Sequence, residues 1–163
     1  MKTTTRAAAL AATVMMMAPL AATASTGDDS MTTRAQELKA QAEQLYDQPG
    51  QWKAAAGLLV RSAALLDRTD AQRYETLLTA GRVYGQAGDL NKARQALEEA
   101  AQCALERGAV FHAGQAYLEA AHVAARQGSA RRATELREKA RALAESPHLS
   151  VESRRHLLEW SAE

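Results

Sequence analysis

The side chains in this sequence that could bind a metal are four histidines and one cysteine. No two of His112, His122, His148 and His156 lie three or four residues apart, the spacing that places two ligands on one face of a helix. Cys103 has no second cysteine with which to complete a thiolate site. The sequence therefore predicts no metal site from these residues.

Two further interpretations of these side chains stay open. Glu152 and His156 lie one helical turn apart and could form a weak surface metal site, although an exposed charge pair is the simpler interpretation. As a single cysteine, Cys103 can form no disulfide within the chain. We expect it to be a small buried hydrophobic residue; the alternative is an intermolecular disulfide or a redox role.

An enzyme would also need a catalytic motif. The segment 81–88, GRVYGQAG, is rich in glycine but lacks the Lys-Ser/Thr pair of a phosphate loop and the preceding strand of a dinucleotide site. Neither Gly-x-Ser-x-Gly nor Ser-x-x-Lys occurs in the chain. We therefore predict a non-enzymatic protein with no catalytic residues and no cofactor.

The composition indicates that helices position the side chains of this protein. Aromatic residues make up 4% of the chain, β-branched residues are scarce, and Ala, Leu, Glu, Gln and Arg are abundant. These abundant types are strong helix formers. We expect an all-α fold.

A repeat with three copies runs through the chain. Gly50, Gly88 and Gly128 are 38 and 40 residues apart, and a period in this range is typical of stacked helical hairpins. Residues at equal distances from each glycine agree in type and fall on one stripe of each helix. The clearest sets are Leu45, Val83 and Val123 five residues before it, Trp52, Leu90 and Ala130 two after, Ala55, Ala93 and Ala133 five after, and Leu65, Cys103 and Leu143 fifteen after.

Turn residues divide the repeat into helices. Gly88 and Gly128 can adopt the left-handed conformation that ends a helix, and a side-chain oxygen directly before the next helix can cap it. The expected caps are Thr69 or Asp70, Asp89, Ser129 and Ser150. Seven helices are predicted, at approximately 32–47, 51–67, 70–87, 89–107, 109–127, 129–145 and 150–161.

The second copy resembles the tetratricopeptide repeat (TPR) in its small residues, its aromatic residue and its turn glycine. The residues that carry the resemblance are Leu77, Gly81, Tyr84, Gly88, Leu90, Ala93, Leu97 and Ala100. The third copy departs from the pattern at Arg137, where a large apolar residue is usual, and the first departs at Glu43, which replaces the small residue. The resemblance covers 34–145 and implies a right-handed superhelical stack of antiparallel helical hairpins, with about three repeats longer than the family's usual roughly 34 residues.

The residues after the repeat domain, 146–163, predict a C-terminal capping helix. A stack of hairpins needs a terminal element with a polar outer face. We expect Leu157, Leu158 and Trp160 to pack back onto the last hairpin.

The resemblance also implies a concave face lined by the first helix of each hairpin, where a peptide or a partner helix would bind. The corresponding positions in this sequence are Gln41, Gln44, Arg82, Gln86, Glu119, His122 and Arg126. The alternative for each of them is an ordinary solvated surface. Ala40 and Leu78 stand where some family members place groups that clamp a C-terminal carboxylate. We therefore do not expect that mode of binding, although Arg82 and Arg126 could hold an acidic peptide.

The N-terminus, residues 1–24, has the three zones of a secretory signal. Lys2 and Arg6 precede an apolar stretch that ends near Leu20, and the small residues Ala22 and Ala24 fit a cleavage site after Ala24. A membrane anchor is the alternative, but the apolar stretch is shorter than the roughly 20 residues a spanning helix needs. We expect export to the periplasm or the medium, with a disordered linker at 25–33.

The charge balance is close to neutral. The 20 basic and 19 acidic side chains become 18 and 19 once Lys2 and Arg6 are removed with the signal. Nucleic-acid binding needs clustered basic residues, so we predict no nucleic-acid partner. We expect a protein or peptide partner at the concave face and no stable membrane span after removal of the signal. The alternative is a homo-oligomeric structural unit of the cell envelope that packs through its terminal helices.

Overall fold

The computed structural model describes residues 26–162, with side chains from residue 29 onward, and contains helices and no strands in this part of the chain. The expectation of an all-α fold with seven helices is confirmed there. The helices are α1 (Thr26–Tyr46), α2 (Trp52–Ala64), α3 (Ala71–Gln86), α4 (Leu90–Glu106), α5 (Val110–Arg126), α6 (Ala130–Ala144) and α7 (Val151–Trp160). The signal peptide expected at 1–24 lies outside the described residues.

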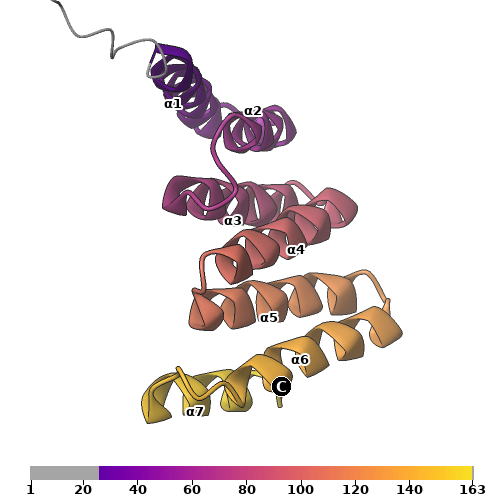
Figure 1. The fold of residues 1–163 in the computed structure, drawn as a ribbon. Helices are drawn as coiled ribbons and strands as arrows, with labels where there is room; N and C mark the ends of the chain where they lie inside the picture. The colour runs from indigo at the N-terminus through magenta and orange to yellow at the C-terminus, as the bar shows by residue number, and fades with distance from the viewer. Residues whose placement is uncertain (1–25, 163) are drawn as a thin grey trace, which may run out of the picture.

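Each helix packs against its neighbour in the chain, and the helices follow one another in chain order from α1 to α7 (Figure 1). Short connections join them, so that neighbouring helices lie side by side in opposite directions. α7 contacts α5 as well as α6. Within the described part, no helix has the length and apolar content needed to cross a bilayer.

The turn glycines adopt the predicted left-handed conformation. Gly88 has φ +75° and Gly128 has φ +76°. The backbone N–H of Asp89 donates to the carbonyl of Tyr84 at 2.9 Å, and Ser129 makes the same bond to Ala124. This pattern satisfies carbonyls that the end of a helix leaves without a partner.

Three of the expected N-terminal caps form and one does not. Asp70 accepts a hydrogen bond from the backbone of Gln72, Asp89 from Lys92, and Ser150 from Ser153. Ser129 occupies the cap position of α6, but its side chain makes no capping bond. Ser129 therefore predicted the start of α6 correctly, but the capping hydrogen bond that we expected from it does not form.

The first helix starts earlier than the expected residue 32, because α1 begins at Thr26 and so includes most of the segment 25–33 that we expected to be a disordered linker. The Thr33 hydroxyl donates to the backbone carbonyl of Asp29 at 2.8 Å, and Arg34 pairs with Glu37 across one turn at 2.7 Å. Interactions one turn apart stabilise a helix, whereas our prediction considered only the polar composition of the segment.

Small residues bring the helices close together in the core. Most buried residues of the hairpins are alanines, with fully buried leucines between them. A Cβ on Gly81 would lie 2.6 Å from Cγ of Leu97, and a Cβ on Gly114 would lie 2.7 Å from a methyl carbon of Leu157. A side chain at either glycine would overlap the leucine that packs against it, so Leu97 of α4 or Leu157 of α7 would have to move.

The capping helix packs only partly as expected. Leu157 is fully buried against Gly114, but Leu158 and Trp160 are each 45% exposed. A helix turns about 100° per residue, so adjacent Leu157 and Leu158 cannot both face the hairpin. Arg141 of α6 fixes the end of α7, since its guanidinium donates to the hydroxyl and the carbonyl of Ser161.

Candidate functional site

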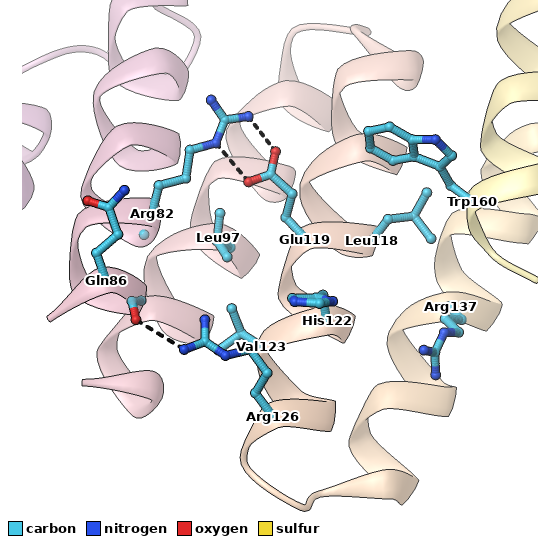
Figure 2. A pocket seen from close by; sticks show the side chains of 12 residues that line it. Arg82, Gln86, Leu97, Leu118, Glu119, His122, Val123, Arg126, Arg137 and Trp160 are labelled. Atoms are coloured by element: carbon cyan, nitrogen blue, oxygen red, sulfur yellow. Dashed lines mark hydrogen bonds and ion pairs between the residues drawn. The ribbon is translucent and has the colours of Figure 1, made fainter. Parts of the chain in front are cut away.

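A hollow of about 680 Å³ lies between α3, α5 and the C-terminal helices, and α4 contributes to its floor. This volume falls within the range that ligand sites usually occupy. We call it the hollow; its lining residues, shown in Figure 2, are Gly81, Arg82, Gly85, Gln86, Leu97, Leu118, Glu119, His122, Val123, Arg126, Arg137 and Trp160.

The hollow brings together five of the seven residues predicted for the concave face. They are Arg82 and Gln86 from α3, and Glu119, His122 and Arg126 from α5. The spacing of three or four residues places each set on one face of its helix. Because α3 and α5 belong to successive hairpins, the two faces border the same space.

The other two predicted residues, Gln41 and Gln44, lie apart from this space. Both are exposed on α1, and neither lines the hollow. The hollow therefore involves the second and third hairpins together with α7.

The floor of the hollow is apolar. Leu97, Leu118 and Val123 are buried, and the two glycines of α3, Gly81 and Gly85, expose no side chain there. A ligand seated here would cover apolar carbon and lose water from its own apolar groups, which is favourable.

Arg82 and Glu119 form a two-point ion pair across the hollow. The Nε of Arg82 donates to Oε2 of Glu119 at 2.9 Å, and Nη2 donates to Oε1 (Figure 2). This hydrogen bonding raises the pKa of Arg82 above its usual value. The positive charge that we expected at Arg82 is thus compensated within the chain.

Arg126 and Arg137 are bonded differently. Arg126 donates from Nη2 to the carbonyl of Gly85 at a long 3.4 Å, as Figure 2 shows. Across the described residues, neither arginine has a carboxylate within ion-pair distance. Two positive charges therefore border an apolar floor without an anionic partner from residues 29–162.

Trp160 forms the wall of the hollow that α7 provides. Its ring lies 4.5 Å from the ring of His156, which in turn lies 5.8 Å from Phe111 of α5. Such ring contacts restrain an aromatic side chain while leaving one face open. Trp160 can therefore offer a flat apolar surface to a ligand.

Our sequence analysis missed Arg137 and Trp160 as site residues. Arg137 was visible as a charged residue at a position where the repeat pattern has a large apolar one. Trp160 gave no comparable signal, because its place beside α3 and α5 depends on how α7 packs.

Cys103 lies outside the hollow and is fully buried. Burial raises the pKa of its thiol above the usual value. The prediction of a small buried hydrophobic residue is confirmed. Among the residues that the structure describes, no three His, Cys, Asp or Glu side chains gather as metal ligands would.

Comparison with known proteins gives no relative, since the sequence matches no family profile and no curated protein. The resemblance to the tetratricopeptide repeat therefore depends on the residues quoted above.

Proposed function

We propose that this chain is an exported, non-enzymatic repeat protein of the TPR type that binds a protein or peptide partner. The partner would lie in the hollow, on the inner face of a right-handed superhelical stack of hairpins. The observation that carries the proposal is the pair Arg126 and Arg137 beside an apolar floor.

The lining of the hollow suits a peptide. Binding sites for peptides combine apolar pockets with a few polar groups that fix orientation. Here Leu97, Leu118 and Val123 supply the apolar part, and Gln86 and His122 offer exposed hydrogen-bonding groups at the rim.

A crosslinking pull-down from cell-envelope extract tests the proposal. The bait is the chain itself beside the double variant Arg126→Glu, Arg137→Glu. A matched control is Arg61→Glu, Arg107→Glu, because both arginines are exposed, lie outside the hollow and make no ion pair among the described residues. We expect one protein to be captured by the parent and by the control, and lost with the hollow variant. Equal capture by all three baits would contradict binding in the hollow.

Export is tested separately. We expect the chain recovered from the envelope or the medium to begin at Ser25, because the proposed cleavage follows Ala24. N-terminal sequencing checks this, and an intact Met1 in the cytosolic fraction would contradict it.

Self-association is a second candidate, favoured by exposed apolar side chains on α7. Val151 is 82% exposed, and Leu158 and Trp160 are each 45% exposed. Sedimentation of the parent beside Val151→Ser, Leu158→Ser distinguishes the two candidates. A dimer that the variant converts to a monomer would support self-association, whereas a monomer in both would exclude it.

A further inference from the structure

We infer that the segment bound in the hollow is an acidic peptide with a large apolar side chain beside its carboxylate. Arg137 and Arg126 would supply the positive charges that attract its acidic groups, and the apolar side chain would lie against Trp160. This inference rests on the proposed function and specifies the chemistry of the partner.

The position of Arg137 in the repeat is the first observation. The residue nine positions after the turn glycine is Leu59 in the first hairpin, Leu97 in the second and Arg137 in the third. Leu59 and Leu97 are each 1% exposed, whereas Arg137 is half-buried and lines the hollow. The third hairpin therefore directs a guanidinium into the space beside a core position.

The bonding of the half-buried arginines is the second observation. Among residues 29–162, every half-buried arginine except Arg137 bonds to a carboxylate or a backbone carbonyl. Arg73 bonds to Glu99, Arg94 to Glu98, Arg132 to Glu98 and Glu135, and Arg154 to the carbonyls of Ala144 and Ser146. The guanidinium nitrogens of Arg137 are accessible at the surface of the hollow, where an anionic ligand can bond to them without displacing a partner within the described residues.

The charges around the hollow indicate that the ligand is negatively charged. Glu119 is occupied by Arg82, which leaves Arg126 and Arg137 as the uncompensated charges of the lining. Glu138, next to Arg137 in sequence, lines a second depression together with Arg137 and Arg141, but it makes no ion pair with Arg137. A carboxylate accepts two parallel hydrogen bonds from a guanidinium, so acidic side chains fit these groups.

The apolar floor and Trp160 give the second requirement. A small inorganic anion would satisfy the arginines but leave the exposed ring of Trp160 uncovered. Aromatic and aliphatic side chains both pack well on an indole face. The ligand should therefore combine charge and apolar surface in adjacent residues, as an extended peptide does.

Panning a displayed library of random short peptides on the immobilised chain tests this inference. We expect the enriched peptides to place Asp or Glu next to Leu, Phe or Trp. Arg137→Gln and Arg126→Gln should each weaken an enriched peptide about tenfold, the effect of losing one hydrogen-bonded charge. Arg107→Gln, the control, should leave its affinity unchanged, and circular dichroism should show equal helix content in all variants.

Intrinsic fluorescence reports the place of binding. In a Trp52→Phe variant, Trp160 is the single remaining tryptophan, because the chain has two. Titration with an enriched acidic peptide should change its emission, and a peptide with Gln in place of its acidic residues should not. An unchanged emission during binding would overturn the inference.

The outcomes separate this inference from the proposed function. Enrichment of basic or uncharged peptides that still depend on the hollow would overturn the acidic ligand and leave peptide binding intact. No enrichment of any peptide would overturn both. Displacement of the acidic peptide by inorganic phosphate or laurate at equal concentration would show a simple anion site and also overturn the inference.

Discussion

In the hairpin α3–α4 the position nine residues after the turn glycine is Leu97, whereas in the hairpin α5–α6 it is Arg137. Leu97 packs so closely on α3 that the facing residue is Gly81. The residue equivalent to Gly81 in the third hairpin is Ala121, which is buried in α5. Equivalent positions therefore carry a closely packed leucine in one hairpin and a charged side chain that lines the hollow in the next.

This difference shows how a repeat can acquire a site. The turns, caps and small residues are shared by both hairpins and determine how the helices pack. One substitution at a shared position then changes the chemistry of the surface between the helices. The fold tolerates the substitution because Arg137 is only half-buried, so that its charged end can reach solvent.

The largest expected effect comes from making the second hairpin like the third. Leu97→Arg places a charge without a partner at a fully buried position, so we expect the free energy of unfolding to fall by about 3 to 5 kcal/mol. Urea denaturation followed by circular dichroism measures this. A loss below about 1 kcal/mol would show that the position in α4 accepts a charge as readily as α6 does.

A smaller effect is expected on the other side of the same contact. Gly81→Ala gains about 1 kcal/mol of helix propensity but forces overlap with Leu97, which costs about 1 to 3 kcal/mol. Gly85→Ala on the same helix is the control, since its Cβ would have 3.9 Å to its nearest neighbours. Thermal unfolding should show Gly81→Ala below Gly85→Ala; the reverse order would contradict the close approach of α3 and α4.

Making the third hairpin like the second should change stability and binding in opposite directions. Arg137→Leu restores the apolar residue of the other hairpins, and we expect the free energy of unfolding to rise by about 1 kcal/mol, since a leucine there would be partly buried. Binding of an enriched acidic peptide should be lost. Calorimetric titration and urea denaturation measure the two quantities; unchanged binding with raised stability would leave Arg137 without a role in the site.

The smallest expected effect concerns Cys103, which stands where the first and third hairpins have Leu65 and Leu143. Burial raises the pKa of its thiol above 9.0, the value for an exposed thiol. The thiol's contribution to stability is therefore complete below pH 9 and is lost as the pH rises through the folded-state pKa. Above pH 9, the stability of Cys103→Ala should fall less steeply than that of the parent, in parallel urea titrations; identical slopes would contradict a protonated buried thiol.

The fold could be predicted from the sequence because its signals are local. Gly88 and Gly128 marked helix ends, and Asp70 and Asp89 marked helix starts, through bonds that span only a few residues. The start of α1 was predicted wrongly, because the polar composition of 25–33 hid the bonds that Thr33 and Arg34 make within the helix.

The candidate site could be predicted only where the resemblance to the tetratricopeptide repeat implies groove positions. Arg82 and Arg126 followed from those positions, and both line the hollow. The ion pair between Arg82 and Glu119 could not be predicted from the sequence. It joins residues 37 positions apart, and it depends on how two hairpins pack together. The position of Trp160 at the hollow could not be predicted for the same reason, since α7 lies outside the repeat.

The packing of each helix on its neighbours in the chain has a consequence for how the molecule folds. Apart from the contact of α7 with α5, the main helix contacts join elements that follow one another in sequence. Such contacts close short loops, so little chain entropy is lost before packing begins, and folding should be fast. A structure held together in this way can also open from either end while its middle stays closed.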